Sequence, residues 1–424
     1  MELPRIALLK QTIPAPQLDD PLEKLRQGLE ALNLGARLKP GARVAVTAGS
    51  RGVTDMLAVI REVVAHLKSL GAEPFVAPAM GSHGGATDQG QAEVLKKLGI
   101  TEQSVGAPIV SHVETVQIAD SSYGDPVLVG RDFAEADQVV LVNRVKPHTS
   151  FRGVVESGLF KMMVIGMGKP AGARVAHRLF LRHGFEPVVL EFSRHIMEKL
   201  PILCGVALVE NRLERTAALE VLEPARFLEV EKELLVKARE LMGRVPFEDV
   251  DLLVVDEIGK NISGAGLDSN VTGRIMHQAT PEPRPQRFRR IYLRDLTDES
   301  GGNALGMGTA DFISRRLREK IDLDKTRINC VTATVPEKGR IPITYDHDRQ
   351  AILDALSSAG VSRPPETRLV WIKNTLELDY MWISGALAEE ARSNPQLELL
   401  TEFRELPFDA DGNLPFGSFR PPQG

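Results

Sequence analysis

Residues 43–82, RVAVTAGSRGVTDMLAVIREVVAHLKSLGAEPFVAPAMGS, decide the fold class. A short apolar run, RVAVTA, precedes a longer segment, residues 56–71, in which apolar side chains recur at helical spacing, and a second apolar run, PFVAPA, follows. This order of strand, helix and strand is typical of a βαβ unit, whose two strands lie parallel in one sheet. The stretch therefore predicts an α/β protein.

The same alternation occurs twice along the chain, on either side of a long amphipathic helix expected at residues 224–243. A new buried strand is expected within residues 247–260, where the alternation restarts. A chain of 424 residues also exceeds the usual size of a single hydrophobic core. We therefore expect two α/β domains with mainly parallel sheets and an active-site cleft between them. Their expected ranges are residues 1–247 and 248–375, with a C-terminal segment, 376–424, that packs back on the first domain.

Three segments of the second domain carry explicit secondary-structure expectations. GTADFISRRLREKI (308–321) and DRQAILDALSSAG (348–360) predict helices, and RINCVTATV (327–335) predicts a strand. The two cysteines, Cys204 and Cys330, lie in apolar runs without a CxxC neighbour, so they are expected to be buried thiols in a reducing compartment.

The charge and hydropathy patterns exclude several classes of partner. With 52 basic and 57 acidic residues interspersed and a formal net charge of -5, the sequence offers no extended positive face for nucleic acid. No window holds about 18 uninterrupted apolar residues, and the start of the sequence lacks the pattern of a signal peptide. We expect a cytoplasmic protein that binds neither nucleic acid nor a membrane.

Three polar side chains each follow a predicted strand: Arg51, His83 and His148. In parallel α/β sheets ligands bind beyond the carboxyl ends of the strands, so these side chains are expected at one edge of the sheet. A guanidinium matches a carboxylate or phosphate, and two neutral imidazoles can move protons on opposite faces of one carbon, which suits a racemase or epimerase. The alternative for each residue alone is a surface or turn position.

Lys161 and His177 are two further candidates in the next segment. Lys161 lies in the apolar run GLFKMMVIG, where partial desolvation would make its amine a better nucleophile; the alternative is an amine that reaches water from a buried stem. His177 lies in a probable helix, ARVAHRLFLRHG, where histidines are usually packing or surface residues. No HExxH or CxxC motif occurs, which disfavours a conventional zinc enzyme.

A glycine pattern supports a competing interpretation. Gly166, Gly168 and Gly172 resemble a dinucleotide fingerprint, with Glu186 or Glu191 near the place of a ribose-binding acid. The apolar segment before these glycines is short for a strand, and the TAGSRG turn has no such motif. An NAD-linked oxidoreductase is therefore kept as an alternative.

Together these motifs resemble the nickel-dependent lactate racemases and their homologues. The resemblance is carried by AGSRGVTD, the histidine loop GSHGGATD, the KPH motif, and a lysine followed sixteen residues later by a histidine. It covers most of residues 40–200 and continues more faintly through 251–274, as expected of a divergent homologue. The family fold implies two α/β domains that enclose the site.

The resemblance also implies a cofactor and a role for each residue. The family's nickel pincer nucleotide would be tethered to Lys161, with His177 as nickel ligand, so cofactor-biosynthesis enzymes would be partners. His83 and His148 would be the paired acid/base residues, and Arg51 would contact the substrate carboxylate or the cofactor phosphate. The implied activity is that of an isomerase that racemises or epimerises a 2-hydroxy acid by hydride removal and return.

The sequence departs from the family pattern at several positions. The spacing from His148 to Lys161 is longer than in lactate racemases, which makes Lys169 a rival tether. The segment GKNISGAGLDSNVTGR replaces the family's tyrosine-rich motif, and its Lys260 and Arg274 are candidates for substrate contact. We therefore expect a hydroxy acid other than lactate. A non-catalytic protein that binds a carboxylate or nucleotide on the same fold is the second alternative.

Overall fold

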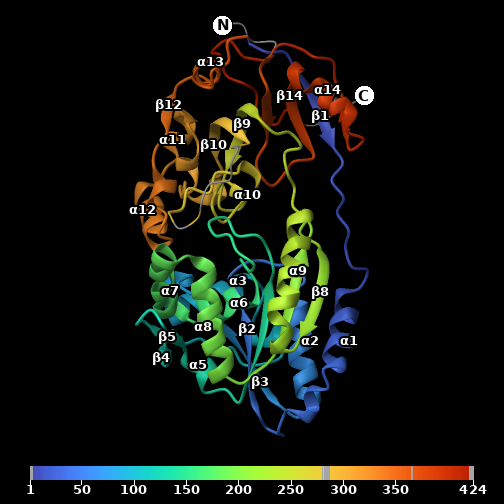
Figure 1. Cartoon of the computed structure of the whole chain (residues 1–424), viewed down its shortest axis with the longest axis vertical. Helices are drawn as coiled ribbons and strands as arrows, with labels where there is room; N and C mark the ends of the chain where they lie inside the picture. Colours follow the sequence, from blue (N-terminus) through green and yellow to red (C-terminus); the bar gives the residue numbers. More distant parts are fainter. Residues whose placement is uncertain (1–2, 279, 281–286, 364–365, 420–424) are drawn as a thin grey trace. The chain divides into compact units, whose positions relative to one another are not determined.

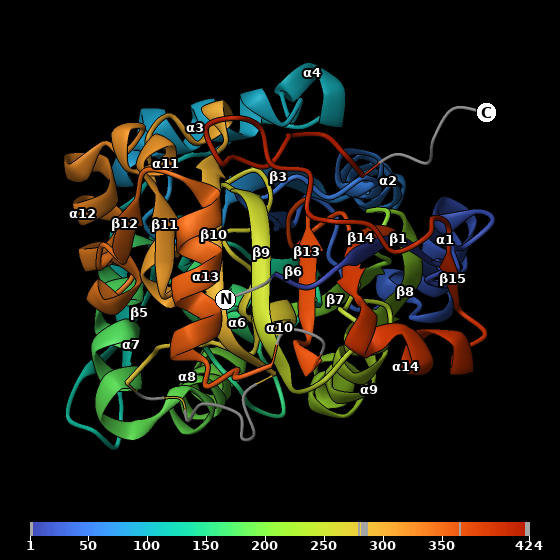
Figure 2. The ribbon, with the colours of Figure 1, turned by 90° about the horizontal axis from the view of Figure 1, so that it is seen from above.

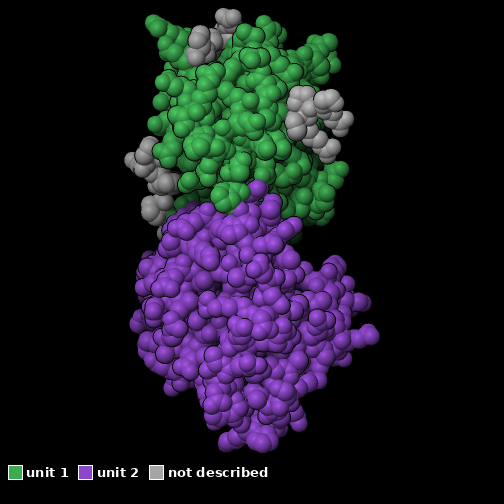
Figure 3. Space-filling view, turned by 90° about the vertical axis from the view of Figure 1, so that its right-hand side faces the viewer, with its two compact units in different colours: residues 1–14, 243–424 green, residues 15–242 purple. Residues whose placement is uncertain are grey.

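The computed structural model describes residues 3–278, 280, 287–363 and 366–419. The chain forms two compact units, Ala15–Met242 (unit 2) and Met1–Pro14 together with Gly243–Gly424 (unit 1), which are coloured separately in Figure 3. Each unit contains a mixed sheet with mainly parallel strands and helices packed against it (Figure 1). The expected α/β class is confirmed.

The division of the chain differs from the expected domain ranges at both ends. Strand β1 (Ile6–Gln11) pairs antiparallel with β14 (Tyr380–Ser384) and with β15 (Leu397–Leu399), so the N-terminal residues belong to unit 1. The C-terminal segment 376–424 likewise lies in unit 1, not on unit 2. The physical reason is that β1 is apolar and nearly fully buried, so its backbone groups need strand partners on both edges.

Unit 2 is built on a five-stranded sheet with the order β3-β2-β6-β7-β8. The strands are β2 (Arg43–Ala48), β3 (Glu73–Pro78), β6 (Gln138–Arg144), β7 (Ile202–Glu210) and β8 (Thr216–Leu222). The first four in the sheet are parallel, and β7 and β8 form an antiparallel pair. The apolar runs of the sequence alternate between the two faces, since Val44 and Val46 contact one core and Ala45 the other.

Helices cover both faces of this sheet. On one face lie α1 (Pro21–Ala31), α2 (Met56–Ser69), α3 (Asp88–Lys97) and α4 (Glu102–Val105). On the other lie α6 (Leu159–Lys161), a π-helix (Met162–Gly166), α7 (Lys169–His183), α8 (Phe185–Lys199) and α9 (Phe227–Glu240). A separate hairpin of β4 (Thr115–Asp120) and β5 (Pro126–Gly130), followed by α5 (Arg131–Ala134), packs on this second layer. The arrangement is a doubly wound α/β layer structure.

Unit 1 is built on an eight-stranded sheet with the order β12-β11-β10-β9-β13-β14-β1-β15. Its parallel part comprises β9 (Val250–Ile258), β10 (Phe288–Leu296), β11 (Phe312–Ser314), β12 (Ile343–Tyr345) and β13 (Leu369–Ile372). The helices are α10 (Ser269–Thr272), α11 (Arg315–Glu319), α12 (Leu323–Thr332), α13 (Asp348–Ser358) and α14 (Ala388–Ser393). Helix α13 lies across the sheet over β10 (Figure 2).

Two local expectations in unit 1 are wrong. Residues 327–335 were expected to form a strand, but most of them lie in and just after helix α12, whose N-terminus is capped because the Asp322 carboxylate accepts the Lys325 N–H (2.9 Å). Only Thr326 and Cys330 of this helix are buried, at a helical spacing, so the cap and the packing override the β-branched composition. The segment 308–321 is helical only in α11 and contributes strand β11 before it.

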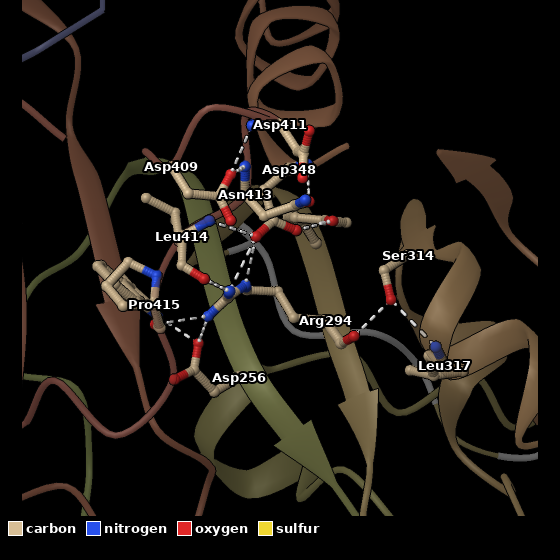
Figure 4. Close-up of polar contacts among 12 residues, drawn as sticks. Asp256, Arg294, Ser314, Leu317, Asp348, Asp409, Asp411, Asn413, Leu414 and Pro415 are labelled. Carbon is tan, nitrogen blue, oxygen red and sulfur yellow. Dashed lines mark hydrogen bonds and ion pairs between the residues drawn. The ribbon is translucent and has the colours of Figure 1, made fainter. Parts of the chain in front are cut away.

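A buried charge network joins the C-terminal segment to the sheet of unit 1 (Figure 4). Arg294 of β10 has no exposed side-chain surface and pairs with both Asp256 and Asp348, the latter at 2.8 Å. It also donates to the carbonyl oxygen of Leu414, and the Leu414 N–H donates to Asp348 (2.8 Å). Trp371 donates its indole N–H to Asp256 (2.6 Å). These contacts hold the C-terminal segment against β10.

No helix among the described residues is long and apolar enough to cross a lipid bilayer.

Candidate functional site

The carboxyl ends of β3, β2 and β6 meet at one edge of the unit 2 sheet, because these strands are parallel neighbours. Arg51 lies in the loop after β2, His83 in the loop after β3 and His148 in the loop after β6. This edge is where loops separate and helix N-termini offer N–H groups to a ligand. The strand order thus brings all three loops to one end of the sheet.

His83 is tied directly to the loop that carries Arg51. Its Nδ1 atom shares a hydrogen bond with the hydroxyl of Ser50. The loop after His83 packs tightly on α3: a Cβ atom added to Gly84, which has φ +67°, would lie 2.4 Å from the carbonyl carbon of Gly90. Only glycine fits there, so Gly84 allows this loop to pack against its helix.

His148 is held by both its backbone and its ring. Its N–H donates to Oε2 of Glu156 (2.7 Å), and its Nδ1 atom accepts the Ser150 N–H (3.0 Å). A neutral imidazole that accepts at Nδ1 carries its proton on Nε2. The ring stacks on Phe151 with centroids 4.6 Å apart. The contacts therefore fix the orientation and the tautomer of this imidazole.

His177 of α7 also stacks against Phe151. Its ring stacks on Phe151 at 6.4 Å and meets Phe180 edge-on at 5.5 Å. His148 and His177 therefore contact one phenyl ring, although 29 positions separate them in the sequence. Phe151 was not singled out from the sequence, yet it is the residue that joins these two candidates.

Lys161 occupies the last position of the short helix α6, directly before the π-helix. The π-helix contains a hydrogen bond between residues five positions apart, from the Met167 N–H to the Met162 carbonyl (2.8 Å). The apolar run GLFKMMVIG is thus helical and contains a π-bulge. Such bulges occur often at functional sites, since they reorient the side chains beside them.

The start of this helix is capped by a residue far away in the sequence. Glu231 of α9 is fully buried and accepts the N–H groups of Leu159 (2.6 Å) and Phe160 (3.3 Å). A Cβ atom on Gly158 would lie 2.5 Å from the Glu231 carboxyl carbon, so this position needs glycine. Burial raises the pKa of Glu231 to about 7, against the lowering effect of the two N–H donors.

Positive charge gathers around Lys161. Burial, and after it the charge of Arg51, lower the pKa of Lys161 from 10.5 to about 7, whereas Glu156 acts to raise it. Desolvation and the charge of Arg144 lower the pKa of Arg51, which keeps exposed surface and stays protonated. Arg144 is paired with Glu210. An amine that is partly neutral at pH 7 thus lies near the Arg51 guanidinium, a group suited to an anion.

Lys169, the rival tether, is placed differently. Its side chain is fully buried, and its amine donates to the Pro78 carbonyl (2.7 Å) at the end of β3 and lies 5.4 Å from the Phe133 ring centroid. Burial lowers the pKa of Lys169 to about 8, against the nearby Asp132 and Asp88. An amine enclosed in this way fastens α7 to the end of β3.

The dinucleotide-like glycines lie inside helical turns, not in a turn between a strand and a helix. A Cβ atom would lie 2.8 Å from the Ala79 carbonyl oxygen at Gly166, 2.3 Å from the Val164 oxygen at Gly168 and 3.0 Å from the Leu128 oxygen at Gly172. These glycines therefore allow close packing of the helix. A phosphate-binding fingerprint requires the strand-to-helix turn that is lacking here.

Two further acidic residues of the site were missed from the sequence. Glu156 has no exposed side-chain surface and binds Arg239 of α9 (2.7 Å) as well as the His148 N–H. It is the one acidic residue in VVESGLF, a signal that could have marked it. Glu231 falls on the apolar stripe of its helix, with Phe227 and Leu234, and a carboxylate in such a stripe is a similar signal.

Lys260 and Arg274 both lie in unit 1 and form hydrogen bonds with other residues of that unit. The Arg274 guanidinium donates to the carbonyls of Thr309 (2.9 Å) and Arg289 (2.9 Å) and pairs with Asp311 (2.7 Å). These contacts favour a structural role for Arg274. Lys260 donates to the Gly264 carbonyl and to Asn329 (3.0 Å).

The described residues include no group of three or more His, Cys, Asp or Glu side chains placed to hold a metal ion.

Comparison with known proteins gives a fold relationship. Residues 38–222, which include Arg51, His83, His148, Lys161 and His177, match the family described as Domain of unknown function (DUF362). No curated protein matches the chain. Among solved structures, the lactate racemase apoprotein from Thermoanaerobacterium thermosaccharolyticum superposes with a TM-score of 0.53 at 11% sequence identity, over 87% of this chain and 94% of that one. The chain shares the fold of a lactate racemase.

Proposed function

We propose that this protein is an isomerase that racemises or epimerises a 2-hydroxy acid other than lactate. The observation that carries the proposal is Lys161, an amine with a pKa near 7 placed beside Arg51 at the sheet edge that also presents His83 and His148. The fold shared with a lactate racemase supports it.

The side chains present fit a nickel pincer nucleotide. Lys161 would be the tether, because a partly neutral amine can form a covalent bond to the cofactor at neutral pH. His177 would supply the protein's nickel ligand, since imidazole suits nickel. Arg51 would bind the cofactor phosphate or the substrate carboxylate. When bound, the cofactor would supply a reversible hydride acceptor.

The protein's own contribution would be proton transfer at the substrate hydroxyl. His148 carries its proton on Nε2 and would use it as a hydrogen-bond donor that polarises the substrate oxygen, since a neutral imidazole is too weak an acid to release that proton. His83, bonded to Ser50 through Nδ1, becomes the base when that nitrogen carries the proton, since Nε2 then accepts the hydroxyl proton. Exchange of these roles for the opposite enantiomer would require each ring to take up its other tautomer, which for His148 means losing the hydrogen bond from the Ser150 N–H.

The test uses the full chain produced in a host that also makes the nickel cofactor. We expect a covalent mass increment on Lys161, bound nickel, and interconversion of the enantiomers of at least one 2-hydroxy acid in a chiral-chromatography panel. Lys161→Arg should abolish the increment, whereas Lys96→Arg, an exposed lysine on α3, should retain it.

Isotope retention provides a second criterion. A substrate deuterated at C2 should keep its deuterium in the product, because a hydride returned to the same carbon does not exchange with water. Loss of the label to solvent would refute the hydride route. Unmodified, nickel-free protein that is stabilised by hydroxy acids without turnover would instead identify a binding protein on the same fold.

A further inference from the structure

Glu156 is a buried carboxylate at the centre of the site that the proposed proton transfer does not use. Its side chain has no exposed surface, and each of its oxygens has a partner: Oε2 accepts the His148 N–H (2.7 Å) and Oε1 accepts from Arg239 (2.7 Å). Arg152 lies 3.7 Å from Oε2. Two guanidinium groups, those of Arg152 and Arg239, therefore face this carboxylate.

The first consequence concerns the loop that carries His148. Arg152 donates to the backbone carbonyls of His148 and Phe151, the latter at 3.0 Å. The loop is therefore hydrogen-bonded to both members of the Glu156–Arg152 pair. The Lys146 N–H also donates to the Ser157 carbonyl (3.0 Å), next to Glu156 in the chain. The orientation of the His148 ring thus depends on a loop that is closed on this carboxylate.

The second consequence concerns Lys161, which lies five positions after Glu156 and feels its charge. Two charged groups act on the Lys161 amine: Arg51, from the loop after β2, and Glu156. Arg51 repels the protonated amine, and Glu156 attracts it. The carboxylate therefore acts to raise the pKa of Lys161, whereas desolvation and the Arg51 guanidinium lower it and make the amine more nucleophilic.

We propose that Glu156 is the positioning residue of this site, which holds the His148 loop in place and acts as the counter-charge of Lys161. One carboxylate thus holds the loop of the acid/base side chain through hydrogen bonds and attracts the protonated amine through its charge. The assignment of His148 and Lys161 as functional groups rests on the proposed function, but the charge linkage does not.

The test is the pH dependence of the Lys161 amine in cofactor-free full-length protein. Trace labelling with acetic anhydride at a series of pH values, followed by peptide mass spectrometry, gives the midpoint of the amine titration. Glu156→Gln keeps the size of the side chain and removes its charge, so we expect the midpoint to fall by about one pH unit. Glu156→Asp keeps the charge and should give a midpoint closer to that of the wild type.

Glu186→Gln is the matched control. Glu186 accepts the Val154 N–H (2.8 Å) in the same loop, but it does not act on Lys161. Its substitution should leave the midpoint unchanged. An unchanged midpoint in Glu156→Gln, or equal shifts in Glu156→Gln and Glu186→Gln, would overturn the proposal.

The labelling result is independent of the proposed reaction. A protein without racemase activity can still show the lower midpoint in Glu156→Gln, and this outcome would reject the isomerase while supporting the role of Glu156. An active isomerase in which Glu156→Gln leaves the Lys161 midpoint unchanged would support the proposed reaction and reject the role of Glu156.

Discussion

Replacing Lys161 by Met should stabilise the cofactor-free protein below neutral pH. The substitution keeps the length and most of the volume of the side chain and removes a charge from a largely apolar environment formed by residues such as Phe160 and Met162. The cost of that charge in the folded state is visible in the pKa of Lys161, which falls from 10.5 to about 7.

The sign and the magnitude follow from this shift. Below about pH 7 the amine is protonated in both the folded and the unfolded state, so the folded state bears the full cost; above about pH 10.5 the amine is neutral in both states and the cost vanishes. A shift of this size corresponds to at most about 5 kcal/mol. Lys161 keeps part of its surface exposed, so we expect a gain of about 1–3 kcal/mol.

Unfolding in urea, followed with two probes, measures this gain. Both tryptophans, Trp371 and Trp382, belong to unit 1, so far-ultraviolet circular dichroism is needed to follow unit 2. The transition of unit 2 should move to higher urea at pH 6 and return toward the wild-type value at pH 9.5. A gain that does not change with pH, or a loss of stability at pH 6, would refute the reasoning.

Three further predictions concern buried charges and backbone strain. Arg294→Gln should lower the free energy of unfolding of unit 1 by about 3–5 kcal/mol, seen by tryptophan fluorescence, because Asp256 and Asp348 lose their buried cation; a loss under about 1 kcal/mol would contradict this. Glu231 has its pKa raised from 4.5 to about 7, so the stability contributed by its protonated form is complete below pH 4.5 and lost as the pH rises through 7. Glu231→Gln should therefore gain up to about 3 kcal/mol over wild type between about pH 5 and pH 8 in the dichroism assay, and a constant difference would argue against it. Lys169 has φ +54°, so Lys169→Gly should unfold at higher urea than Lys169→Ala, by about 1 kcal/mol; equal stability would exclude backbone strain at this position.

The regular part of the fold could be predicted from local pattern. The apolar runs around β2, β3 and β6 and the amphipathic α2 have the expected structures, because strand and helix periodicities are local properties of the sequence. The expected placement of their loops at one sheet edge agrees with the strand order. The resemblance to lactate racemases is confirmed as a likeness of fold.

The remaining features depend on contacts between distant residues. The helical state of Leu159 and Phe160 relies on the Glu231 carboxylate, and the orientation of His148 relies on Glu156. The structural contacts of Arg274 are made with carbonyls of segments 14 or more positions away. Periodicity carries no information about such contacts, which is why neither the carbonyl contacts of Arg274 nor the two glutamates could be predicted from the sequence.

The pairing of β1 with β14 affects the order in which the chain can fold during synthesis. Strand β1 emerges from the ribosome about 370 residues before β14, a delay of roughly 20 to 70 s at usual translation rates. The whole of unit 2 is made within that interval and can fold first, while the apolar β1 waits without a partner. The nascent protein therefore carries an unpaired strand through most of its synthesis, and this strand is where chaperones would be needed to prevent aggregation.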